Sequence, residues 1–100
     1  MYLVTFRLRP DEFDEEFRDL NATVEEAAES IPGYRGRRTW ESVDGEEVLV
    51  TYRWDSEEAL AAFAGHEDHL EAKRRWEEWY DAYEVTVAEV VDSYGQGFEE

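Results

Sequence analysis

The fold is decided by residues 31–60, which read IPGYRGRRTWESVDGEEVLVTYRWDSEEAL. Within this segment the pair Asp44-Gly45 marks a tight hairpin turn, because these residue types tolerate the positive φ that such a turn requires. Residues 34–43 and 47–54, on either side of the pair, read as strands. The segment therefore predicts two adjacent antiparallel strands in the middle of the chain.

A strand and a long helix are predicted before this hairpin. Residues 2–8 alternate between apolar and polar side chains with the period of a strand, and Pro10 ends this pattern. From Asp11 the apolar residues recur every three or four positions, which predicts an amphipathic helix that Pro32 and Gly33 stop. The apolar stripe of this helix consists of Phe13, Phe17, Leu20, Val24, Ala27 or Ala28, and Ile31.

A second helical region and a last strand are predicted after the hairpin. Asp55 or Ser56 is the expected N-cap, with Glu58 as the acid of a capping box. Gly65 interrupts the helix, and we expect a second helical piece to pack at a different angle beyond it. The apolar stripe of that piece consists of His69, Ala72, Trp76, Trp79 or Tyr80, and Tyr83. Residues 84–91 are rich in valine and read as a strand.

The predicted order of elements is β-α-β-β-α-β. This order is that of the ferredoxin-like fold, an α+β class with a four-stranded antiparallel sheet. We expect residues 1–94 to form this single domain and residues 95–100 to form a flexible acidic tail.

Both faces of the predicted sheet carry apolar residues. In the third strand Val48, Val50, Tyr52 and Trp54 share one face, while Leu49 lies on the other. Two helices can cover only one face of a sheet, so a two-fold dimer that stacks sheet on sheet would bury the second face. We therefore expect a homodimer.

The charge of the chain limits its partners. The sequence has 27 Asp and Glu against 10 Lys and Arg, a net charge of −17. Such a surface repels nucleic-acid phosphates and anionic lipids, and no apolar run reaches the about 18 residues of a membrane span. We therefore expect a cytoplasmic protein with no nucleic-acid or membrane partner. The even spread of the acids favours halophilic adaptation over an acidic patch for one basic partner.

Four features follow one another along the chain: the β-α-β-β-α-β order, the junction Ile31-Pro32-Gly33-Tyr34, residues 52–60, and the histidine of His69-Leu70. Together they resemble the antibiotic biosynthesis monooxygenase family over about residues 2–94. The resemblance implies a dimeric α/β barrel with a pocket between sheet and helices. Some members of that family oxygenate quinols or polyketide anthrones without metal or flavin, and others bind and degrade haem.

His69 is the candidate catalytic residue, because it shares a stripe with Ala72 and Trp76 and its neutral imidazole can act as a base toward a phenol or quinol. The alternative is a packed or half-exposed histidine hydrogen-bonded to a nearby acid. The candidate substrate-binding residues are Tyr52, Trp54, Phe63 and Trp76. Aromatic side chains of this kind bind flat apolar ligands, or alternatively fill the core and the dimer interface.

The remaining polar residues that could bind a metal or another ligand are two histidines and three arginines. His66 and His69 lack a separated third ligand, so no metal is expected. The chain contains no cysteine, so thiolate chemistry is excluded. The cluster of Arg35, Arg37 and Arg38 can hold a carboxylate or pair with acids across strands.

The predicted function is that of a cofactor-independent monooxygenase acting on a small aromatic or quinol-type molecule. Two alternatives remain open: a haem-binding, haem-degrading enzyme, and a non-catalytic dimeric domain that binds a small ligand. The haem branch of the family places an asparagine in the first strand and a tryptophan and a ligating histidine in the second helix. The resemblance puts Thr5 or Phe6, Phe63 and Lys73 at these positions, so all three depart from the pattern.

Overall fold

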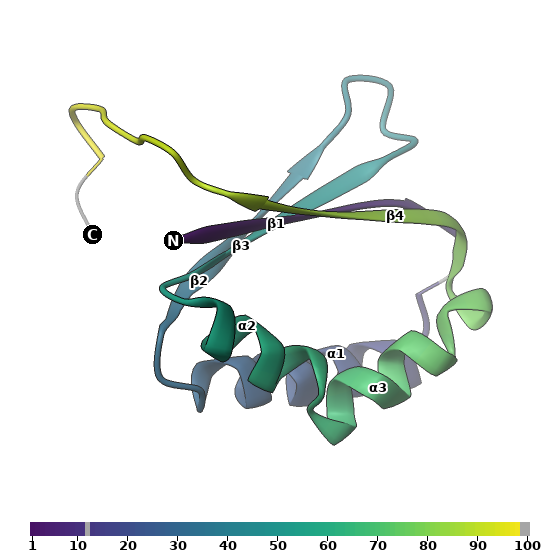
Figure 1. Ribbon diagram of the computed structural model, residues 1–100. Helices are drawn as coiled ribbons and strands as arrows, with labels where there is room; N and C mark the ends of the chain where they lie inside the picture. The colour runs from purple at the N-terminus through teal and green to yellow at the C-terminus, as the bar shows by residue number, and fades with distance from the viewer. Residues whose placement is uncertain (12, 99–100) are drawn as a thin grey trace.

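A four-stranded antiparallel sheet with helices on one face makes up the fold (Figure 1). The computed structural model describes residues 1–11 and 13–98. The elements are β1 (Tyr2–Pro10), α1 (Glu15–Glu29), β2 (Tyr34–Glu41), β3 (Val48–Trp54), α2 (Glu57–Ala64), α3 (Glu67–Arg74), the 3-10 turn η1 (Trp76–Glu78) and β4 (Tyr80–Glu89). The strands lie in the order β2-β3-β1-β4, which confirms the predicted ferredoxin-like arrangement.

The central hairpin forms as predicted, with β2 and β3 paired antiparallel. Gly45 adopts a φ of 76° in the turn. The Asp44 carboxylate accepts hydrogen bonds from the Ser42 hydroxyl at 2.7 Å and from the Glu46 amide at 3.0 Å. Because these hydrogen bonds place Ser42 in the turn, β2 ends at Glu41, two residues before the predicted boundary.

The long helix begins at Glu15 rather than at Asp11. Asp14 is its N-cap, and its carboxylate accepts a 2.8 Å hydrogen bond from the Phe17 amide. Phe13 was predicted to lie in the helix but precedes it; its ring nevertheless stacks on Phe17 at 4.1 Å between centroids. The apolar spacing was therefore correct for packing but not for the helix boundary, which the capping carboxylate determines.

The N-cap of α2 is Ser56, whose hydroxyl accepts a 3.1 Å hydrogen bond from the Ala59 amide. Asp55, the other predicted cap, instead pairs with Arg35 at 2.6 Å. With Ser56 as cap, Glu58 occupies the second helical position, so the predicted capping box is wrong.

Gly65 separates α2 from α3, as the interrupted stripe predicted. The predicted continuation of the helical stripe to Tyr83 is wrong, because α3 ends at Arg74 and β4 begins at Tyr80. In between, Trp79 turns inward: it is 2 % exposed, and its indole N–H donates to Asp14 at 3.2 Å. This anchor redirects the chain from helix to strand four residues earlier than predicted.

Helices α1 and α2 cover one face of the sheet (Figure 1), and a cluster of buried side chains comes from these three parts of the fold. Its members are Val4, Ala28, Trp54, Ala59 and Phe63. The alternation predicted for the first strand is confirmed, since Val4 and Leu8 are buried on the helix side. Trp54 is completely buried and contacts the rings of Tyr34 and Phe63.

The sheet face turned away from the helices is partly apolar. Trp40 and Leu49 are paired across β2 and β3, so their side chains point to the same face. Leu49 is opposite Arg7 of β1. Leu3 lies four residues before Arg7 on the same strand, so its side chain points to the same face as those of Arg7 and Leu49. Trp40 is 56 % exposed. Beyond β4, residues 95–98 of the predicted tail have no regular structure, and residues 99–100 lie outside the described part of the chain.

Gly33 and Gly36 give a matched pair of substitutions. Gly33 has a φ of 100°, and a Cβ added to it would lie 3.0 Å from the Ala59 Cβ; Gly36 has a φ of 103° and nothing within 4 Å. We expect Gly33→Ala to lower the free energy of unfolding by about 2–3 kcal/mol and Gly36→Ala by about 1–2 kcal/mol, because only the first adds a clash to the backbone strain. Urea unfolding measures both; equal losses would contradict the steric contribution.

Candidate functional site

A cavity of about 870 Å³ lies between the sheet and the helices. Its lining is mainly apolar and comes from all four strands and from α1, α2 and α3. All five residues predicted to form the site line this cavity: His69, Tyr52, Trp54, Phe63 and Trp76. A volume of this size accommodates a small multi-ring molecule.

His69 is held on the helix wall of the cavity by α3. The cap of this helix is His66, whose Nδ1 accepts a 3.1 Å hydrogen bond from the Asp68 amide. The His69 ring lies against Phe63, with 4.6 Å between centroids, and its Nδ1 is buried without a hydrogen-bond partner. His69 is packed and partly exposed, as in the alternative interpretation, but no acidic side chain bonds it in the part of the chain that the structure describes.

The protonation state of His69 follows from this setting. Burial lowers the pKa of the imidazole below its usual 6.5, the backbone of Ala64 opposes this effect, and the charge of Lys73 adds to it. The ring is therefore neutral at pH 7. A neutral imidazole in an apolar cavity can accept a proton from a bound hydroxyl group.

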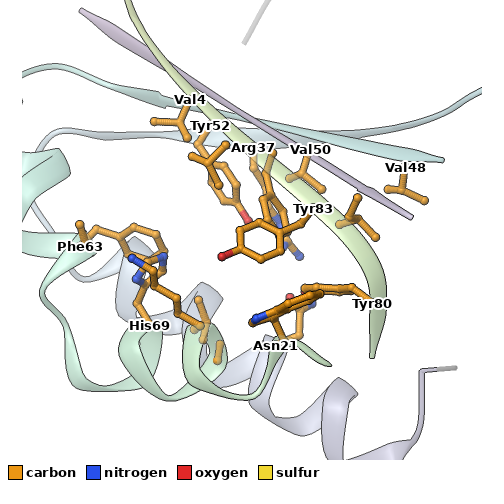
Figure 2. Close-up of a pocket in the computed structure, with 18 of the residues that line it drawn as sticks. Val4, Asn21, Arg37, Val48, Val50, Tyr52, Phe63, His69, Tyr80 and Tyr83 are labelled. Carbon is orange, nitrogen blue, oxygen red and sulfur yellow. The ribbon is translucent and has the colours of Figure 1, made fainter. Parts of the chain in front are cut away.

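The opposite wall carries polar groups from the sheet. Figure 2 shows Tyr52, Arg37 and Tyr83 reaching from the strands into the cavity, across from His69. Burial raises the pKa of Tyr52, while the neighbouring Arg37 guanidinium opposes the rise. Burial also raises the pKa of Tyr80 to about 12. These phenols remain protonated at neutral pH and can donate hydrogen bonds to a ligand.

The predicted aromatic residues occupy different depths. Trp54 is completely buried and packs on Phe63 at 5.0 Å, so it borders the cavity from the core side. Phe63 in turn separates Trp54 from His69. Trp76 makes an edge contact with Tyr83 at 5.0 Å and is half-buried. Phe63 and Trp76 thus present their rings to the cavity more directly than Trp54 does.

Several lining residues were not predicted as part of the site. They include Asn21, Arg37, Lys73, Tyr80 and Tyr83. Tyr80 and Tyr83 were assigned to a helical stripe. Tyr83, Val85 and Val87 occupy every second position, and this period of two could have shown that Tyr83 belongs to a strand. Arg37 pairs with Glu25 at 3.0 Å, so it is held by an acid as expected, but the acid comes from α1 and not from a neighbouring strand.

The described residues contain no group of three or more His, Asp or Glu side chains that could hold a metal ion. Likewise, none of the described helices is both long and apolar enough to cross a membrane.

Comparison with solved structures supports the fold. Rv0793 from Mycobacterium tuberculosis is similar with a TM-score of 0.77 and 24% identity, over 94% of this chain and 98% of that one. A mutant of SnoaB, a cofactor-independent oxygenase from Streptomyces nogalater, is similar with a TM-score of 0.75 and 12% identity, over 92% and 94%. A conserved protein from Methanosarcina mazei Go1 is similar with a TM-score of 0.73 and 17% identity, over 87% and 89%.

Sequence comparison identifies the family. No curated protein matches the chain. The family model described as "Antibiotic biosynthesis monooxygenase" matches residues 1–75, which include β1 to α3 and the histidine wall of the cavity. The chain therefore belongs to the antibiotic biosynthesis monooxygenase family.

Proposed function

We propose that this protein is a cofactor-independent monooxygenase that acts on a small aromatic or quinol-type molecule. The observation that carries the proposal is the neutral, partly buried imidazole of His69 on the wall of an apolar, aromatic-lined cavity. The similarity to SnoaB, a cofactor-independent oxygenase, supports the same chemistry. In this proposal His69 is the base, and Tyr52, Phe63 and Trp76 hold the ring of the substrate, with Trp54 supporting them from the core.

The proposed reaction begins with proton transfer from the substrate hydroxyl to the His69 imidazole. The resulting electron-rich anion reacts directly with O₂. One oxygen atom replaces the two hydrogens of a ring methylene as a carbonyl, and the other leaves as water, so that an anthrone and O₂ give an anthraquinone and H₂O. The apolar lining excludes bulk water from the anion and strengthens its interactions with the polar groups of the sheet wall.

We further propose that the protein works as a homodimer in which the sheet faces pack on each other. Leu3, Trp40 and Leu49 give the face away from the helices the apolar surface that such packing needs. The cavity lies on the opposite side of each sheet, so each subunit keeps its own site.

Haem binding is the alternative enzyme function, and the residues present do not favour it. The position at which the haem branch has its ligating histidine is Lys73. His69 lies one turn earlier on α3. Titration with haemin distinguishes the two functions: we expect no shift of the Soret band, whereas a saturable shift would replace the proposal with haem binding.

Oxygen uptake tests the proposed function. The wild-type protein is incubated with anthrones and quinols, and uptake is followed together with formation of the quinone product. We expect uptake above the rate in buffer for at least one ring system. If no substrate gives uptake, the non-catalytic ligand-binding domain replaces the monooxygenase.

The pH dependence of the reaction follows from the lowered pKa of His69. A base must be deprotonated to act, so we expect kcat/KM to be constant at neutral pH and to fall as the pH drops through an apparent pKa below 6.5. Steady-state rates between about pH 4.5 and 8 measure this acidic limb of the pH profile. The pH at which kcat/KM falls to half reports the pKa of the base in the free enzyme. A limb centred above 6.5 would show that another group is the base.

A further inference from the structure

The cavity differs in charge from the rest of the chain. Among the acidic residues that the structure describes, only Glu84 lines the cavity, although the sequence contains 27 acids. Glu84 is opposite Arg7 in the β1–β4 register, and Arg7 faces away from the helices. Two of the ten basic residues, Arg37 and Lys73, also line the cavity. Negative charge is thus concentrated outside this site.

The two cations of the lining are not equivalent. Arg37 is neutralised by Glu25 at 3.0 Å, and Glu25 also accepts the Tyr34 hydroxyl at 3.0 Å. The side chain of Lys73, the only lysine of the chain, makes no ion pair or hydrogen bond within the described residues. It follows His69 by four positions on α3, so the two side chains share one face of the helix. Lys73 therefore supplies an uncompensated positive charge next to the proposed base.

We propose that the cavity selects an aromatic molecule that bears a carboxylate, and that the ammonium group of Lys73 binds this carboxylate. The inference rests on the proposed function in one respect, namely that this cavity is the substrate site. Lys73 is solvent-exposed, whereas Phe63 is 6 % exposed, so the charged end of the ligand stays near water while its ring enters the apolar interior. A carboxylate suits this position better than a phenol, because it is ionised at neutral pH.

The net charge of the chain makes this local cation important. A protein with a net charge of −17 repels a small anion, and the anion is admitted only where the local potential is reversed. Burial is the main cause of the lowered pKa of His69, and the positive charge of Lys73 acts in the same direction. The side chain that selects the ligand therefore also supports the neutral state of the neighbouring base.

Binding of naphthoate and of its neutral analogue naphthamide tests the inference. Both are titrated into the full chain, with quenching of tryptophan fluorescence as the signal, and no oxygenation is required. For the wild-type protein we expect naphthoate to bind about tenfold more tightly, as for a partly desolvated charge pair. Lys73→Gln should abolish this preference, so that the two probes bind with about equal affinity, and Lys73→Arg should retain most of it.

Arg74→Gln is the matched control. It removes the same charge from the adjacent position, but Arg74 is exposed, pairs with Glu71 and does not line the cavity. The naphthoate preference should survive this change. Equal binding of the two probes, a preference lost equally in Arg74→Gln, or no saturable binding of naphthoate would each overturn the inference. A naphthoate preference that depends on Lys73 would uphold it even if no quinol or anthrone were oxygenated, which separates it from the test of the proposed function.

Discussion

Replacing His69 with glutamine is expected to lower the rate of oxygen uptake by about 10²–10⁴-fold, the usual contribution of a general base. Glutamine keeps a polar side chain of similar length but cannot accept the proton of the substrate hydroxyl. The ring contact with Phe63 is lost, but no hydrogen bond to an acidic side chain breaks, because His69 has none among the described residues. Initial rates of uptake at saturating substrate measure the effect.

His66→Asn is the matched control for this experiment. His66 is the other histidine of the chain, lies outside the cavity lining and caps α3. Asparagine is a favourable N-cap, so α3 should remain in place and uptake should stay near the wild-type rate. An unchanged rate in His69→Gln, or an equal loss in both variants, would remove His69 from the proposed mechanism.

The largest effect on stability is expected from Trp54→Ala. Trp54 is completely buried and packs on Tyr34 and Phe63 at 4.9 and 5.0 Å. Truncation of such a side chain lowers the free energy of unfolding by about 3–5 kcal/mol. Because domains of this size are stable by only about 5–15 kcal/mol, the variant should unfold at a much lower urea concentration, as measured by circular dichroism.

Trp79 provides the comparison that separates packing from hydrogen bonding. The indole nitrogen of Trp54 is buried without a partner, whereas that of Trp79 donates to Asp14 at 3.2 Å. Trp79→Phe should therefore lose about 1 kcal/mol more than Trp54→Phe, beyond the cost of the smaller ring. A larger loss for Trp54→Phe would contradict this assignment of the two indole groups.

Much of the fold could be predicted from local signals. The alternation of β1, the Asp44-Gly45 turn and the Gly65 interruption each depend on neighbouring residues only, and each was confirmed. The start of β4 could not be predicted in this way. Trp76 and Trp79 are spaced as in a helix, but Trp79 is held by Asp14, a residue far away in the sequence.

The candidate site was predicted less completely than the fold. Every aromatic residue chosen from the sequence does line the cavity, because apolar periodicity identifies the inward faces of helices and strands. The sequence could not distinguish Arg37, which is paired with Glu25, from Lys73, which has no ion pair in the described region. That difference depends on which acids the folded chain brings near each cation.

The position of β1 between β3 and β4 has a consequence for biosynthesis. During synthesis β1 leaves the ribosome about forty residues before its neighbour β3, and its second neighbour, β4, follows only at Tyr80–Glu89. Until then one edge of β1 has no hydrogen-bonding partner, and the nascent chain exposes it to other strands. Completion of the sheet is thus a late, non-local event, which slows folding relative to a helical chain of equal length. A nascent chain released after α3 would carry the proposed base, yet lack the strand that closes its cavity.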